Sequence, residues 1–102
     1  MVIVSAPGDY GKPRPAVVVQ SDRLSVDSVL VALVTTTIRD APLYRLSVAP
    51  TEANGLVEPS QIMVDKIFAL SRAKCGQVRG RLDDAALVVL NRMLSTVLGL
   101  AD

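Results

Sequence analysis

The chain of 102 residues lacks histidine and tryptophan, and it has only one cysteine and three aromatic residues. Without histidine, neither a Ser-His-Asp nor a Cys-His triad can be built, and a zinc site is disfavoured. The single cysteine, Cys75, excludes an internal disulfide. We therefore expect a protein with no metal site, no cofactor and no triad chemistry.

Long apolar runs are also missing. The longest uninterrupted runs are short and cover residues 29–34 and 85–90, whereas a membrane-spanning helix needs about 20 apolar residues. The N-terminal Met-Val-Ile-Val-Ser has no charged region typical of a signal peptide. We expect a cytoplasmic protein with no membrane partner.

The composition indicates one folded domain over residues 1–102. Half of the residues are hydrophobic and the net charge is +1, which excludes intrinsic disorder. The apolar residues are mainly aliphatic, with 16 Val, 13 Leu and 4 Ile. Because β-branched side chains suit a pleated surface, this core favours strands.

The hydrophobic pattern predicts several strands and then one helix. Strands are expected at residues 2–5, 16–20, 28–37, 44–48, 62–69 and 77–81, with a Gly- and Pro-rich loop at 7–15 and an Asn54-Gly55 turn within 51–59. After Asp83 or Asp84 as a cap, Leu87, Leu90, Leu94 and Val97 recur at helical spacing, and Gly99 is a stop signal. The predicted fold is a small antiparallel β-barrel or curled sheet with a C-terminal helix packed on it.

Two basic features stand out. Residues 66–81 contain five cations and no acid: Lys66, Arg72, Lys74, Arg79 and Arg81. This stretch is either a footprint for a polyanion or a solvated basic loop. Arg14 lies between Pro13 and Pro15, and prolines favour an extended backbone before them. Arg14 is thus either preorganised to meet a phosphate or an ordinary exposed residue at a loop-to-strand junction.

The segment around Arg14 resembles a known family. Residues 8–22 read Gly-Asp-Tyr-Gly-Lys-Pro-Arg-Pro-Ala-Val-Val-Val-Gln-Ser-Asp. They are similar to the MazF/PemK family of toxin–antitoxin ribonucleases, which carries Arg-Pro-[Ala/Val]-Val-[Val/Leu] where this strand starts. Residues 31–36, 54–56, 60–67 and 80–84, and the final amphipathic helix, resemble further segments of that family in the same order.

The resemblance implies an SH3-like barrel with a terminal helix, a fold shared with the CcdB gyrase poisons. It further implies a homodimeric toxin that cuts single-stranded RNA at short sequences without a metal ion, and so inhibits translation and growth. The products would be a 2′,3′-cyclic phosphate and a 5′-hydroxyl. A cognate antitoxin would occupy the RNA groove through an acidic disordered tail.

By position, Arg14 matches the family's catalytic arginine, Thr35 its active-site threonine, and Asp65 the acid used as a base in the PemK branch. Two features of the family are missing. Met63 stands where the PemK branch has an arginine, and the first loop has no histidine. The complete acid–base pair of that branch is therefore absent.

Cleavage by a 2′-hydroxyl needs a proton acceptor, stabilisation of the charged phosphorane and a proton for the leaving oxygen. Arg14 and Thr35 can donate hydrogen bonds to the phosphate. Asp65 is a candidate acceptor if it is partly buried, and Asp9 is a second one. Alternatively, no single base exists and positioning supplies most of the acceleration. Asp65 is equally well explained as a strand carboxylate paired with Lys66 or an arginine.

Single-stranded RNA is usually held by aromatic stacking and by cations along its backbone. We expect Tyr10 to stack on a base and Asp9 and Thr36 to face the RNA. The cations expected to contact phosphates are Lys12, Arg39 and the pair Arg79 and Arg81. The alternatives are that Tyr10 packs its own loop and that Thr36 is an ordinary strand residue.

Two other functions remain open. A gyrase poison of the CcdB type depends on a C-terminal Trp-Gly-Ile, whereas this chain has Leu98-Gly99-Leu100 and no tryptophan. The other alternative is a non-catalytic barrel that only binds RNA or the antitoxin, which the missing histidine and Met63 would explain.

Overall fold

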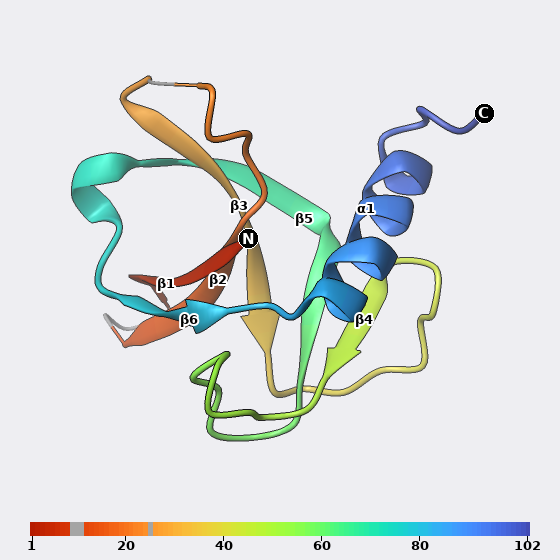
Figure 1. The fold of residues 1–102 in the computed structure, drawn as a ribbon, viewed down its shortest axis with the longest axis horizontal. Coiled ribbons are helices and arrows are strands. Elements are labelled where there is room, and N and C mark those ends of the chain that lie inside the picture. The colour runs from red at the N-terminus through yellow and green to blue at the C-terminus, as the bar shows by residue number, and fades with distance from the viewer. Residues whose placement is uncertain (9–11, 25) are drawn as a thin grey trace.

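The computed structural model describes residues 1–8, 12–24 and 26–102. Its elements are β1 (Val2–Pro7), β2 (Pro13–Val18), β3 (Ser28–Thr35), β4 (Arg45–Val48), β5 (Ser60–Ser71), a short 3-10 helix η2 (Arg72–Lys74), β6 (Val78–Arg81) and α1 (Asp84–Val97) (Figure 1). The predicted architecture, mainly β with a C-terminal helix, is confirmed.

The six strands form one curled antiparallel sheet in the order β4-β5-β3-β2-β1-β6. The longest strand, β5, pairs with both β3 and β4 and carries an irregularity. Ala32 pairs with Ile67 but Val34 pairs with Ile62, so residues 63–66 lie opposite Leu33 alone. Extra residues of this kind bend a strand and increase its twist. The bend in β5 contributes to the half-barrel shape of the sheet (Figure 1).

Every strand differs from the prediction at one boundary or both, for example β1, which ends at Pro7 rather than residue 5, and β5, which spans Ser60–Ser71 rather than 62–69. Two of these differences have a clear physical reason. Strand β2 begins at Pro13, inside the expected loop, and Pro13 and Pro15 pair with Pro7 and Ser5 of β1. Proline is tolerated there because the pairs between β2 and β3 involve only residues 16–18 of β2. Strand β3 ends at Thr35 rather than at residue 37, where the Thr37 N–H donates to Thr35 Oγ1 instead of to a neighbouring strand.

The sheet buries apolar residues on both faces. One core cluster lies between the sheet and α1 and contains Ile3, Val17, Ala32, Val34, Leu56, Ile62, Val64, Leu82 and Leu90. The second lies on the opposite face and contains Ala6, Ala16, Val29, Val31 and Leu70. Strand neighbours alternate between the two clusters, as the two-residue period of a strand requires. Along β2 and β3, a residue two positions from a member of the second cluster therefore lies on the same face of the sheet as that cluster.

Helix α1 packs beside β4 and β5 (Figure 1). Its start is capped by Asp83, whose Oδ1 accepts the Ala86 N–H at 2.7 Å. Leu90 is completely buried and anchors the helix in the first cluster. Gly99 has φ of 74°, a left-handed conformation that suits glycine after a helix end. The predicted cap, apolar stripe and stop signal are all confirmed.

The loop before β5 covers β6. The Arg81 N–H donates to Ala53 O at 2.9 Å, and a Cβ on Gly80 would lie 2.3 Å from the same oxygen. This loop therefore packs its backbone directly on the edge strand. Within the described ranges, every helix falls short of the length and apolarity needed to cross a bilayer.

Candidate functional site

Arg14 lies at the start of β2, in the hairpin that β2 forms with β1. It pairs with Ala6 and its side chain is exposed. A Cβ on Gly8 would lie 2.3 Å from Lys12 O, 2.7 Å from Arg14 Cγ and 2.9 Å from Arg14 Cδ. The aliphatic stem of Arg14 therefore lies directly over the backbone of Gly8, where only glycine leaves room for it. The hairpin thus limits the directions in which the guanidinium can point.

Thr35 is the last residue of β3 and is half-buried opposite Gln61 of β5. In the ladder between β2 and β3, Ala16 pairs with Leu33. The same register, continued by two residues, sets Arg14 opposite Thr35, and opposite residues in an antiparallel pair project from the same face. The paired residues of this ladder stop at Ala16 and Leu33, but the fold sets these two predicted site residues at adjoining ends of neighbouring strands, although they are 21 positions apart in the sequence.

The hydroxyl group of Thr35 already has one partner. Its Oγ1 accepts the Thr37 N–H at 3.1 Å. A threonine hydroxyl has one hydrogen to donate besides its acceptor lone pairs. Because Oγ1 acts as the acceptor in this contact, its hydrogen stays available for an anionic oxygen.

The segment after β3 carries Thr36 and Arg39, and both side chains are exposed. Its backbone is held from the neighbouring strands by two buried polar residues, Arg45 and Gln61. A hollow of about 210 Å³ borders this segment, and Arg39, Arg45 and Gln61 contribute to its lining. Thr36 and Arg39 thus stand on a fixed segment beside Thr35.

Asp65 lies in the irregular part of β5 and is exposed. The prediction that Asp65 acts as a base requires this side chain to be partly buried, and the structure does not show that burial. The pairing places residues 63–66 opposite Leu33, and β3 separates Asp65 from β2. The structure thus does not make Asp65 a direct strand neighbour of Arg14 or Thr35, and its catalytic role stays a prediction.

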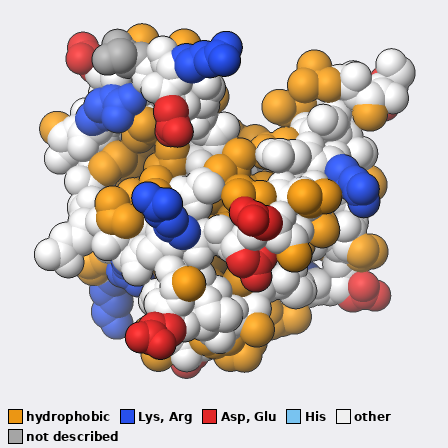
Figure 2. All heavy atoms as spheres, viewed as in Figure 1, with side chains coloured by type: hydrophobic (Ala, Val, Ile, Leu, Met, Phe, Trp, Pro, Cys, Tyr) orange, Lys and Arg blue, Asp and Glu red, His pale blue; other side chains and the backbone are white. Residues whose placement is uncertain are grey.

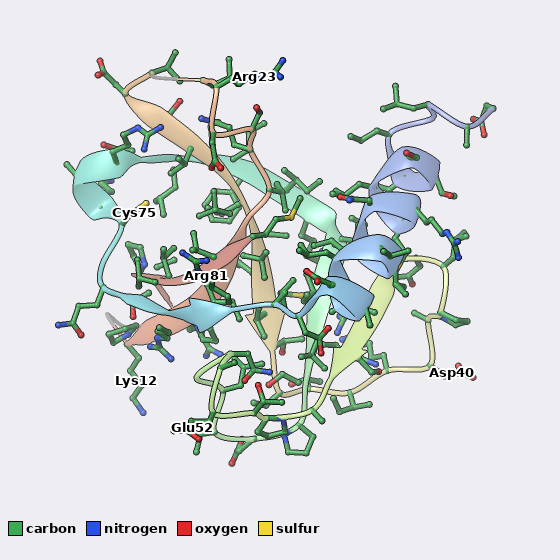
Figure 3. The ribbon with its side chains drawn as sticks, viewed as in Figure 1. Lys12, Arg23, Asp40, Glu52, Cys75 and Arg81 are labelled. Carbon is green, nitrogen blue, oxygen red and sulfur yellow. The ribbon has the colours of Figure 1, made fainter. Side chains whose placement is uncertain are left out.

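Lys12 directly precedes the first residue of β2, and its exposed side chain points outward (Figure 3). Asp9 and Tyr10, for which we predict RNA contacts, lie outside the described residues. In the described part of the chain, no three His, Cys, Asp or Glu side chains are arranged to hold a metal ion.

The cations of the basic stretch 66–81 are divided between β5, η2 and β6. Arg72 Nε donates to Val26 O and so ties η2 to the loop before β3. Arg79 Nε donates to Ser5 Oγ at 2.8 Å, which joins β6 to β1. Figure 2 shows basic and acidic side chains interspersed with apolar ones over the face of the molecule that it presents. At least two of the five cations therefore have structural hydrogen bonds, and the interpretation of this stretch as one polyanion footprint is not supported.

The pairing of Arg45 with Gln61 could not be predicted from the sequence. Alternation placed Arg45 and Ser47 on the face of β4 opposite Leu46, but it could not show that Arg45 is 8% exposed and Gln61 4% exposed. Their hydrogen bonds join residues that are up to 22 positions apart. Only the pairing of β4 with β5 brings them together.

A sequence profile described as the PemK-like, MazF-like toxin of type II toxin–antitoxin systems matches residues 2–98. The chain belongs to this family. The "Probable endoribonuclease MazF" of Mycolicibacterium smegmatis (strain ATCC 700084 / mc(2)155) is 40% identical over 99 residues, which cover 95% of this chain and 91% of that one. The predicted family resemblance is therefore confirmed.

Solved structures agree with the assignment of the fold. The Mycobacterium tuberculosis toxin MazF-mt6 superimposes with a TM-score of 0.83 at 25% identity, over 97% of both chains. A structure described as an endoribonuclease in complex with its cognate antitoxin, from a mycobacterial species, has a TM-score of 0.81 at 23% identity, over 97% of this chain and 92% of that one. The curled sheet with its terminal helix is thus the MazF-like fold.

Proposed function

We propose that this MazF/PemK-like toxin is a sequence-selective endoribonuclease that acts in the cytoplasm on single-stranded RNA. The ribose 2′-oxygen attacks the adjacent phosphorus, and the bond from phosphorus to the 5′-oxygen of the next nucleotide breaks. The products are a 2′,3′-cyclic phosphate and a 5′-hydroxyl, no metal ion takes part, and the loss of intact mRNA inhibits translation and growth.

The observation that carries this proposal is the placement of Arg14 and Thr35 on neighbouring strands of a MazF-like chain. Arg14 offers a planar set of donors suited to a phosphate, and the hydroxyl hydrogen of Thr35 is free to donate. Donors held in place before the reaction stabilise the extra negative charge of the phosphorane without reorganising. Arg14 and Thr35 are therefore proposed to lower the free energy of the transition state.

The two proton transfers need other groups. We propose Asp65 as the acceptor of the 2′-proton because it matches the family's acid and is accessible to RNA, although it lacks the partial burial that favours a base. Asp9 remains the second candidate. Lys12, Thr36, Arg39 and Tyr10 are proposed to hold the RNA on either side of the cut, with Tyr10 stacking on a base.

We further propose that the active form is a homodimer and that a cognate antitoxin blocks the RNA groove with an acidic disordered tail. The complex of one fold relative with its cognate antitoxin supports this partner class. An acidic tail suits the same cationic side chains that would hold the RNA phosphates.

The test is to incubate the purified protein with a long, weakly structured RNA in EDTA and to map the ends. We expect discrete cuts that leave cyclic phosphates. Arg14→Ala should lower the cleavage rate at least 100-fold, about the loss measured when one preorganised donor is removed. Arg23→Ala is the matched control because Arg23 is also exposed but lies in another loop.

Three results would overturn the proposal. Cleavage by Arg14→Ala at the parental rate would remove Arg14 from the site. RNA binding without cutting would favour the non-catalytic barrel. DNA cleavage in a parallel reaction with gyrase, and none with RNA, would favour a gyrase poison.

A further inference from the structure

Two buried polar side chains beside the proposed site have no role in the reaction described above. Arg45 opens β4 and Gln61 is the second residue of β5, and both are more than nine-tenths buried. Arg45 Nη1 donates to Gln61 Oε1 at 3.3 Å and to Thr37 O at 3.1 Å. The guanidinium therefore connects β5 to the segment that follows β3.

Gln61 holds the same segment at a second point. Its Oε1 accepts the Arg39 N–H at 3.0 Å, and its Nε2 donates to Arg39 O at 2.9 Å. The Thr37 N–H in turn donates to Thr35 Oγ1 at 3.1 Å. Hydrogen bonds thus hold residues 35–39 in place at Thr35, Thr37 and Arg39, although β3 ends at Thr35.

The burial of Arg45 is unfavourable for the stability of the fold. Arg45 Nε is buried and has no hydrogen-bond partner among the described residues. Removing a charge and a polar group from water without full compensation is unfavourable, and apolar residues of similar volume often serve stability as well or better. A buried arginine with an unpartnered donor therefore needs an explanation other than packing.

We propose that Arg45 and Gln61 form a clamp that positions residues 35–39 for RNA cleavage. Gln61 pairs with Thr35 across the sheet and also binds the backbone of Arg39, while Arg45 fixes the carbonyl of Thr37. The clamp sets where the Thr35 hydroxyl and the Arg39 side chain meet the substrate. Arg45 and Gln61 are positioning residues, and their role rests on the function proposed above.

The kinetic test uses a short fluorogenic RNA with one cleavable site. Arg45→Met keeps an unbranched apolar stem but is shorter than arginine and removes its donors. We expect kcat to fall at least tenfold while KM changes less than threefold. Arg92→Met is the matched control, because Arg92 is exposed on α1, and it should leave both constants unchanged. A parental kcat in Arg45→Met would overturn the proposal.

A double-mutant cycle tests whether Arg45 acts through Thr35. In a Thr35→Ala background, Arg45→Met should lower kcat by a clearly smaller factor than in the parent, since one of the two groups that it positions is gone. Fully additive losses would overturn the coupling. If Arg45→Met does not fold, Arg45→Lys takes its place. This variant should keep part of the parental activity, because its single amine can donate to one of the two acceptors of Arg45, Thr37 O or Gln61 Oε1.

Amide hydrogen exchange gives a readout that does not depend on cleavage. In Arg45→Met, the Thr37 and Arg39 amides should exchange at least tenfold faster. The Leu56 and Ala86 amides, which bond to Asn54 and Asp83 elsewhere, should not change. Equal acceleration at all four amides would mean global destabilisation and would refute the clamp. Failure of the proposed function would give a different result. Thr35→Ala would then cleave RNA at the parental rate, while the faster exchange of the Thr37 and Arg39 amides in Arg45→Met would still be observed.

Discussion

Replacing Gly80 with alanine should loosen the contact that joins β6 to the loop before β5. A Cβ at this position would lie 2.3 Å from Ala53 O, 2.6 Å from Asn54 C and 2.8 Å from Asn54 O. All three atoms belong to the backbone, so no side chain can swing aside. Either β6 or the loop has to move.

The loop resists such a movement because the buried side chain of Asn54 fastens it. Its Oδ1 accepts the Thr51 and Leu56 N–H groups at 2.9 and 3.0 Å, and its Nδ2 donates to Ala49 O at 2.9 Å. A shift would also break the hydrogen bond from the Arg81 N–H to Ala53 O. One lost backbone bond costs about 1 kcal/mol and overpacking about 1–3 kcal/mol. We therefore expect a loss of about 2–4 kcal/mol in the free energy of unfolding, a large part of the 5–15 kcal/mol typical of such domains.

The assay is urea unfolding of Gly80→Ala beside Gly99→Ala, followed by circular dichroism. Gly99 has φ of 74°, but a Cβ there would meet only Asp102 Oδ2, at 3.6 Å, among the described residues. Its substitution should cost about 1 kcal/mol, from the backbone conformation alone. Both changes restrict the unfolded chain equally, so that effect cancels between them. If Gly80→Ala were no less stable than Gly99→Ala, the packing argument would be refuted.

Two further predictions concern the proposed site. Gly8→Ala should lower RNA cleavage at least tenfold although Arg14 is retained, because the new Cβ would lie 2.3 Å from the backbone oxygen of Lys12 and within 2.9 Å of the Arg14 stem. A parental rate in the single-site RNA assay would show that the stem can move without loss. Asp65→Asn should lower kcat by about 10²–10⁴, the range expected when a general base is removed, with RNA affinity unchanged in filter binding. A loss below tenfold would instead assign the acceleration to positioning and electrostatics.

The sequence predicted those features that depend on neighbouring residues. The change from strand to helical period located α1, and Asp83 and Gly99 marked its ends as observed. The apolar run at 29–34 lies within β3. Arg14 was singled out because two prolines flank it, and the structure places it at the start of β2. In each case the signal lies within a few residues of the feature.

Features that depend on distant partners could not be predicted in this way. The irregularity that places residues 63–66 of β5 opposite one residue of β3 follows from how three strands share one sheet. Residues 66–81 form a continuous basic stretch in the sequence, but Arg72 and Arg79 bind groups 46 and 74 positions away. The burial of Arg45 likewise depends on partners that no local pattern reveals.

The register of the sheet is the property on which the candidate site depends. Arg14 and Thr35 share a face only because Ala16 pairs with Leu33, and a slip of one residue would turn every side chain of β2 to the other face. Val17 and Ala32 oppose such a slip, because both are fully buried in the core under α1. Gln61 extends this control past the end of β3, since it pairs with Thr35 and also holds Arg39. The core therefore fixes the relative positions of the groups that we propose to meet the scissile phosphate, even though those groups lie at strand ends.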